Sequence, residues 1–236
     1  MASSNQKNAA QASSQLVFAA VAILAALAIC WSPISAAIVT TRKGAAMVNL
    51  SEICKSYDAY VHANGSTRIL PAQPGDTAHA VAVLLARSSQ LNGAVDWFVK
   101  TDPKLNGDSV PTTVITGTPD SINPDFANKT LSYNIVADIT LSPTPQGGTP
   151  NPFYIPIAWT RGLREDGTWA PDSPWLGEGG HIAFLDGHVL WFNRLSIQQG
   201  ADLIFKYGTN VPTTNIREAL PPGAVILQAE PGTGSK

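Results

Sequence analysis

The sequence predicts an α+β fold that begins with one long helix and continues into a domain with an antiparallel β-sheet, short extra helices and long loops. Two observations support this fold class. A charge-free run from Asn8 to Thr41 passes directly into a one-sided apolar pattern with helical spacing. Later in the chain, short segments of alternating polarity are separated by Pro/Gly-rich stretches, a pattern typical of strands joined by loops. Two further apolar segments flank the turn pair Asp186-Gly187.

The composition limits the possible functions. Hydrophobic residues make up 44% of the 236 residues and charged residues 14%, against roughly 25% charged in ordinary soluble domains. With 19 Gly and 18 Pro, this composition suits a loop-rich extracytoplasmic domain. The net charge of −2 offers no electrostatic footprint for nucleic acid, so no nucleic-acid partner is expected.

The N-terminal apolar segment, Leu16 to Val39, is long enough to cross a bilayer core of about 30 Å as a helix. Within it, Ala22 and Ala26 form a small-xxx-small pair that lets helices approach closely, and Pro33 predicts a kink. Three fates stay open: a retained membrane anchor, a pilin-like helix that later packs against copies of itself, or a secretory signal cleaved near Ser35-Ala36-Ala37.

The helical pattern continues beyond Arg42 and ends at Asn64-Gly65. Its predicted apolar stripe is Met47, Leu50, Cys54, Tyr57 and Val61, with Ile53 and Tyr60 beside it. Tyr57 and Tyr60 are therefore interpreted as core residues. On one continuous helix Cys30 and Cys54 would lie about 36 Å apart, so each is predicted to be a buried small hydrophobic residue and not half of a disulfide.

The rest of the chain is divided by its turn residues. The predicted elements are a helix over Ala78–Leu91 capped by Asp76 or Thr77, a surface loop over Asn106–Asn128, strands over Leu131–Thr140 and Phe153–Thr160, a helix from the capping box of Ser196 and Gln199 to about Tyr207, and a strand over Ala224–Gln228. The predicted divisions are a flexible N-terminus (1–15), the hydrophobic helix (16–41), the globular domain (42–208) and a Pro/Gly-rich tail (209–236).

The Asp186-Gly187 pair between two apolar runs is the strongest local signal. It predicts a two-residue type I′ hairpin in which residue 185 pairs with residue 188. In that register Ile182, Phe184, Val189 and Trp191 share one face, and Ala183, Leu185, Leu190 and Phe192 share much of the other.

His181, Asp186 and His188 are the residues of this hairpin that could bind a metal ion or take part in catalysis. In the predicted register the two imidazoles are about 13 Å apart, too far to share a metal ion, and Asp186 belongs to the turn. Asp186, Gly187 and His188 are therefore interpreted as structural residues, with no catalytic, metal or cofactor site and no enzymatic activity expected. A metal-dependent hydrolase that uses both histidines is the weaker alternative.

A second alternative is a secreted or surface binding module whose signal segment is removed. Trp159, Trp169 and Trp175 lie in a Pro/Gly-rich region, where exposed aromatic side chains would form a platform for a ligand.

Three sequence segments together resemble one bacterial family. They are Asn49 to Tyr60 followed by Ile69-Leu70-Pro71, Trp97-Phe98-Val99 followed by Asp102-Pro103, and the glycine-led DGHV segment from Gly179 to Trp191. In this order they resemble the type II secretion pseudopilin-like proteins, which have a prepilin-type N-terminal helix and a C-terminal H-x9-DG domain. The chain resembles a divergent form, because Leu176 stands at the histidine position of that motif and Lys100 at a cysteine position.

The resemblance implies a pilin-like fold, with the long N-terminal helix laid on the antiparallel sheet. It also implies a single-pass protein of the bacterial inner membrane whose globular domain is periplasmic or extracellular. The implied function is a non-enzymatic structural subunit of a type II secretion or type IV pilus-like assembly, without a cofactor. The implied partners are other pilin-like subunits, contacted through the N-terminal helix.

Overall fold

The computed structural model describes residues 37–63, 72–73, 75–88, 91–117, 121–140, 151–198 and 203–231. The chain forms two compact units, Met1–Gly44 and Ala45–Lys236. In the first unit residues 37–44 are helical, and the hydroxyl of Thr41 donates a hydrogen bond to the carbonyl of Ala37 (2.9 Å). All other described elements belong to the second unit.

The described helices are mostly short. They are the N-terminal helix (residues 37–63), α2 (Ala78–Arg87), α3 (Pro124–Ala127) and the 3-10 helices η1 (Ala94–Trp97), η2 (Pro103–Leu105), η3 (Pro152–Tyr154) and η4 (Ile216–Ala219). In the described part of the chain, no helix combines the length and mean hydropathy needed to cross a bilayer.

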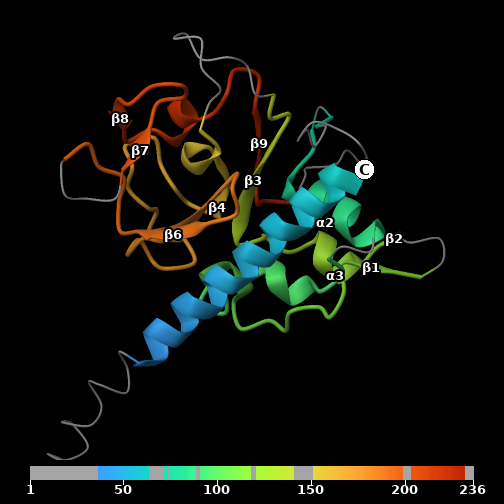
Figure 1. The fold of residues 1–236 in the computed structure, drawn as a ribbon. Coiled ribbons are helices and arrows are strands. Elements are labelled where there is room, and N and C mark those ends of the chain that lie inside the picture. Colours follow the sequence, from blue (N-terminus) through green and yellow to red (C-terminus); the bar gives the residue numbers. More distant parts are fainter. Residues whose placement is uncertain are drawn as a thin grey trace, which may run out of the picture. The chain divides into compact units, whose positions relative to one another are not determined.

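The main sheet has five antiparallel strands in the order β6-β5-β4-β3-β9 (Figure 1). Its strands are β3 (Tyr133–Ala137), β4 (Pro156–Thr160), β5 (Gly180–Phe184), β6 (Val189–Phe192) and β9 (Val225–Leu227). Two small ribbons complete the described strands: β1 (Ile115–Thr116) with β2 (Ser121–Ile122), and β7 (Ile204–Phe205) with β8 (Pro212–Thr213). The expected mixed fold with an N-terminal helix and an antiparallel sheet is confirmed at this level.

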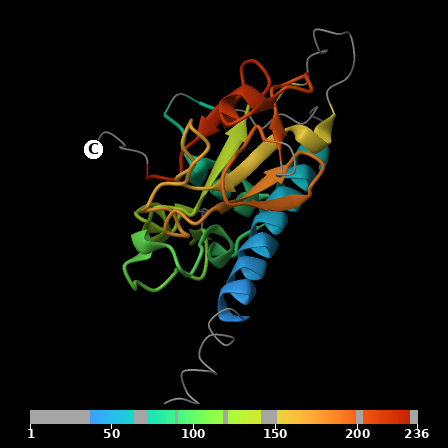
Figure 2. The ribbon, with the colours of Figure 1, turned by 90° about the vertical axis from the view of Figure 1, so that its left-hand side faces the viewer.

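Residues 45–63 of the N-terminal helix lie along one face of the sheet, as Figures 1 and 2 both show. The buried stripe consists of Ala46, Leu50, Ile53, Cys54, Tyr57 and Val61. The Tyr133 hydroxyl of β3 donates to the carbonyl of Ala46 (3.2 Å), which fixes the helix against the sheet. The prediction that Met47 belongs to this stripe was wrong. Met47 is 44% exposed, because in this turn of the helix Ala46 is the residue that faces β3.

The hairpin of β5 and β6 is present, but its predicted register was wrong by one residue. His181 pairs with Trp191 and Ala183 with Val189, and the Gly187 N–H donates to the Phe184 carbonyl (2.8 Å). The loop therefore has three residues, and of its residues only Gly187 has a positive φ (+91°), as in a type I turn followed by a left-handed glycine.

This register changes which residues of β5 share a face with Val189 and Trp191 of β6, because neighbouring side chains of a strand point to opposite faces. His181, Ala183, Val189 and Trp191 share one face. Ile182 and Leu190 lie on the other, where Phe184 also points.

Several predicted boundaries also change. The second helix ends at Arg87 instead of Leu91. The predicted helix after Ser196 was wrong: residues 196–198 are not helical, and Ile204–Phe205 form β7 against β8. The Ser196 hydroxyl accepts from the Gln198 N–H (3.1 Å) and closes a turn where the helix would begin, and the pairing with β8 takes the residues that would end it.

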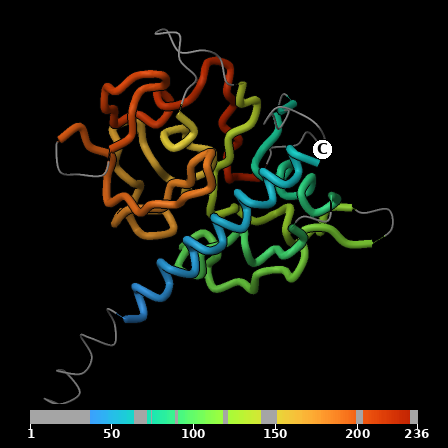
Figure 3. The backbone as a smooth tube through the Cα atoms, in the orientation of Figure 1, coloured from blue at the N-terminus to red at the C-terminus, as the bar shows by residue number. Residues whose placement is uncertain are grey.

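The C-terminal segment completes the sheet. β9, predicted as a strand over Ala224–Gln228, pairs with β3 through Ile135↔Leu227 and Ala137↔Val225. Figure 3 shows this late segment running beside the much earlier β3. Residues 225–227 are therefore part of the main sheet.

Candidate functional site

In the turn of the hairpin, the ionisable side chains of Asp186 and His188 lie in direct contact. Asp186 Oδ1 accepts hydrogen bonds from the backbone N–H of His188 (3.2 Å) and from its ring Nδ1 (2.5 Å). The carboxylate therefore holds the proton on Nδ1 and leaves Nε2 as the basic nitrogen of the neutral ring. Nε2 is buried and has no hydrogen-bond partner among the described residues.

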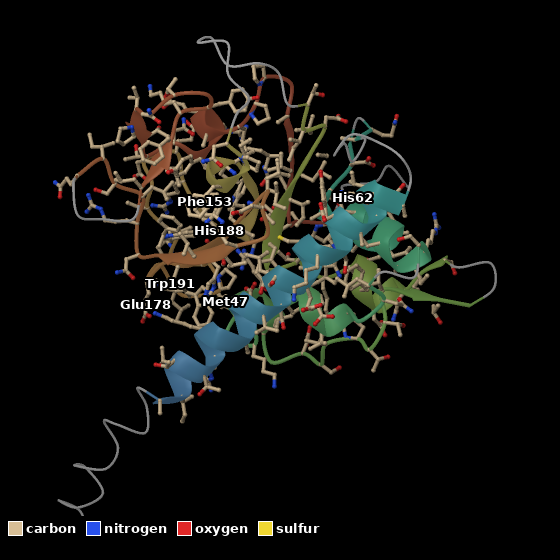
Figure 4. All side chains as sticks on the ribbon, viewed as in Figure 1. Met47, His62, Phe153, Glu178, His188 and Trp191 are labelled. Atoms are coloured by element: carbon tan, nitrogen blue, oxygen red, sulfur yellow. The ribbon has the colours of Figure 1, made fainter. Side chains whose placement is uncertain are left out.

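Two phenylalanine rings stack on this imidazole. His188 stacks on Phe184 (centroids 4.4 Å apart, planes at 3°) and on Phe153 (4.0 Å, 18°). The two phenyl centroids are 6.5 Å apart and their planes are nearly parallel, so the three rings form one aromatic cluster. Phe184 belongs to β5 and Phe153 to η3, so this aromatic stack ties the hairpin to the segment before β4 (Figure 4).

The local sequence explains why these groups meet. Asn151 caps η3 by accepting from the Phe153 N–H (3.1 Å), and Pro152 fixes the first turn. Gly187 supplies the left-handed position that returns His188 to the level of Phe184. The turn residues are predictable from the sequence, but Phe153 is not, because its part depends on a contact between separate elements.

The chemistry open to this pair is limited. An Asp–His pair can accept a proton at Nε2, but among the described residues no hydroxyl or thiol hydrogen-bonds to His188. No group of three or more His, Cys, Asp or Glu in the described part of the chain has the arrangement of a metal site. What the described contacts of His188 do is join the turn to Phe153 of η3.

A cavity of about 160 Å³ lies between the N-terminal helix and this turn. It is lined by Cys54, Lys55, Tyr57, Asp58, Ile157, Leu185, Asp186 and Gly187. Burial raises the pKa of the Cys54 thiol to about 12, so at neutral pH the sulfur is protonated and is not a nucleophile. Lys55 is paired with Glu52 (2.7 Å), and Asp186 with His188.

His181 lies in a different environment from His188. It points to the opposite face of the hairpin and contacts the rings of Trp191 (4.9 Å) and Trp175 (6.1 Å) edge-on. The alternative of a hydrolase that uses both histidines needs the two rings at one site. Because His181 and His188 lie in separate aromatic clusters on opposite faces of the hairpin, the structure gives no support to the hydrolase hypothesis.

The other predicted assembly residues divide into two groups. Tyr57 is buried in the core and Tyr60 packs against the core while partly exposed, in agreement with their interpretation as packing residues. Ala22, Ala26 and Pro33 lie outside the described residues.

The predicted tryptophan platform is wrong. All three are buried: Trp159 lies within β4, Trp169 packs against Gly180 of β5, and Trp175 meets the rings of His181 and Trp191 edge-on. The exposed aromatic pair is Phe153 and Tyr154, whose rings meet edge-to-face at 5.1 Å.

A buried polar network was not predicted from the sequence. Arg161 Nη2 contacts Asp102 Oδ1 at 2.5 Å, and Asp102 Oδ2 accepts from the Ser132 hydroxyl (2.7 Å). Arg161 also lies 3.7 Å from Asp172, which in turn pairs with Lys104 (3.1 Å). The hydrogen bond from Lys104 lowers the pKa of Asp172. The one available signal was an arginine directly after a buried strand.

Comparison with known proteins adds no relative. No family model matches the chain, and neither a curated protein nor a solved structure shows significant similarity to it.

Proposed function

We propose that this protein is a non-enzymatic, membrane-anchored subunit of a pseudopilin-like assembly, with its globular domain on the periplasmic or extracellular side of the bacterial inner membrane. The N-terminal apolar segment is the anchor and the contact to other subunits. The sheet domain is the part presented to water.

The observation that carries the proposal is the packing of residues 45–63 along an antiparallel sheet, with Ala46 held by Tyr133. In sequence this helix directly follows a charge-free run whose apolar part, Leu16 to Val39, has the length of a membrane span. The apolar run would then enter the lipid phase, and residues 45–63 would cover the protein core.

Deletion of residues 16–39 tests the anchor. The full chain should sediment with membranes and resist extraction by high salt, whereas the deletion variant should be recovered in the soluble fraction. Because the buried stripe of residues 46–61 is intact, the variant should retain the tryptophan fluorescence of a folded domain. A deletion variant that stays in the membrane fraction contradicts the proposal.

Replacement of Ala22 and Ala26 by Leu tests the contact between subunits. Leucine adds apolarity, so membrane insertion should persist, while close helix approach is lost and crosslinking between copies should fall. Ala20→Leu with Ala28→Leu is the matched control, since these positions fall on the opposite side of an ideal helix. Equal crosslinking in both double variants would argue against association through this face.

A second candidate function is a secreted binding module, and the exposed pair Phe153 and Tyr154 favours it. Mass spectrometry of the native protein separates the two candidates. A chain that begins near Ala37 or Ile38 supports the secreted module, and a chain that retains Leu16 supports the anchored subunit.

A further inference from the structure

Leu176 has a conformation that a leucine rarely adopts. Its φ is +53°, in the left-handed region, where a residue with a Cβ loses roughly 1–2 kcal/mol. Its side chain is also 64% exposed, so no burial in the domain offsets this strain. A strained and exposed apolar side chain suggests a contact outside the domain.

The turn that presents Leu176 is held firmly. The Leu176 N–H donates to the Ser173 carbonyl (2.9 Å), and the Gly177 N–H donates to the Ser173 hydroxyl (3.0 Å). The preceding Trp175 is buried and meets the Trp191 ring edge-on at 5.5 Å. The turn therefore fixes Leu176 beside the β6 edge of the sheet.

Met47 extends this surface onto the N-terminal helix. Figure 4 draws Met47 next to Trp191 and Glu178, and Figures 1 and 2 both place β6 beside the helix. Met47 is 44% exposed, and the half-buried Trp191 donates its indole N–H to Asn193 (2.7 Å), so its ring presents hydrocarbon. We call Met47, Leu176 and Trp191 the edge patch.

We infer that the edge patch rests in the headgroup region of the lipid bilayer. This inference rests on the proposed membrane anchor. Met47 follows Thr41, the last residue of the charge-free run, by six positions. Six residues reach at most about 20 Å even when fully extended, so Met47 stays within that distance of the end of the run.

The chemistry of the edge patch fits lipid. Tryptophan is enriched at the membrane interface because its ring is apolar and its N–H polar, and Met and Leu supply side chains that enter the acyl boundary. Glu178, which Figure 4 labels beside Trp191, is acidic, so contact would depend on apolar burial and not on attraction to anionic lipid. The anchor makes this contact intramolecular, which lets a small patch suffice.

The test uses the full chain in phosphatidylcholine vesicles, with an environment-sensitive fluorophore on one introduced cysteine. The labelled variants are Leu176→Cys and, as matched control, Ile197→Cys, since both native side chains are 64% exposed. Both carry Cys30→Ser, and Cys54 is buried with its pKa raised to about 12. Lipids bearing a nitroxide in the headgroup region quench a fluorophore that lies in the interface, and Met47→Cys is the second site if Leu176→Cys fails to fold.

With vesicle flotation confirming membrane binding, quenching at position 176 should exceed that at 197 about threefold, because interfacial residues lie within about 5–10 Å of the headgroup boundary. Equal quenching at the two positions in floating protein overturns this inference and leaves the anchor intact. Protein that does not float refutes the proposed anchor, and the inference with it. A spectral change at 176 that disappears on dilution of the protein in lipid identifies a second copy as the occupant and also overturns it.

Discussion

Arg161 and Asp102, 59 positions apart in the sequence, form an ion pair shielded from solvent, with side chains 4% and 0% exposed. Asp102 also accepts from Ser132 and from the Lys104 backbone N–H (2.9 Å), so its carboxylate is held on three sides. The pair joins the end of β4 to η2.

Replacing Arg161 with Met should destabilise the protein by about 3–5 kcal/mol, because Asp102 is left as a buried charge without its partner. Lys55→Met is the matched control. It breaks the exposed pair with Glu52 and should cost less than about 1 kcal/mol. Urea unfolding followed by tryptophan fluorescence measures both. Similar losses for the two variants would show that the Arg161 pair contributes no more than a surface pair.

The pH dependence of stability should include a contribution from His79. Burial lowers its pKa, opposed by a hydrogen bond in which its Nε2 meets the Lys129 carbonyl (2.9 Å). Below about pH 6.5 the His79 side chain binds a proton more readily in the unfolded chain than in the folded protein. The stability of the fold therefore falls as the pH drops below about 6.5 and is retained above it.

Comparison with His79→Gln isolates this contribution. As the pH falls from 7.5, the free energy of unfolding of the wild type should decrease relative to that of the variant. Between the pKa of His79 in the unfolded chain and its lower pKa in the folded protein, the decrease should be about 1.4 kcal/mol for each pH unit. Urea midpoints measured across this range supply the comparison. A constant difference between the two proteins at every pH would refute it.

Gly180 and Gly187 of the hairpin should respond differently to alanine. A Cβ at Gly180 would lie 2.5 Å from two ring carbons of the buried Trp169, so Gly180→Ala should cost about 3 kcal/mol. At Gly187 no atom lies within 4 Å, and the cost should be about 1 kcal/mol from its positive φ. Thermal unfolding of the two variants gives the order, and the reverse order would contradict the packing of Trp169 on β5.

Cys54 should resist alkylation in the folded protein. Its burial and raised pKa keep the thiol protonated and inaccessible, so in a Cys30→Ser background a maleimide at pH 8 should modify Cys54 only after urea is added. Mass spectrometry before and after unfolding reads the result. Rapid modification without urea would show that the helix of residues 45–63 separates readily from the sheet.

The hairpin shows what sequence reasoning can and cannot supply. The Asp186-Gly187 pair located the turn and the partner strands correctly. It did not determine the register, because a two-residue type I′ turn and a three-residue turn with a left-handed glycine both place glycine at this position. Asp186 prefers the second, since it avoids positive φ and its carboxylate hydrogen-bonds to His188.

The aromatic stack and the buried ion pair were beyond sequence reasoning for another reason. Phe153 meets His188, and Arg161 meets Asp102, only after separate elements have packed together. The helix predicted after Ser196 failed similarly: Ile204 and Phe205 pair with β8, and this tertiary pairing overrides the local helical pattern. Periodic elements such as residues 45–63 and α2 were predictable because their apolar spacing records the buried face directly.

The pairing of β9 with β3 has a consequence for synthesis. β3 is complete when residue 137 leaves the ribosome, but its second neighbour arrives only with residues 225–227. Until residues 225–227 have been synthesised, one side of β3 has unpaired backbone groups that an adjacent nascent chain can bind. A cell producing this protein has to protect that open strand for the whole interval, and a chain terminated early would never close it.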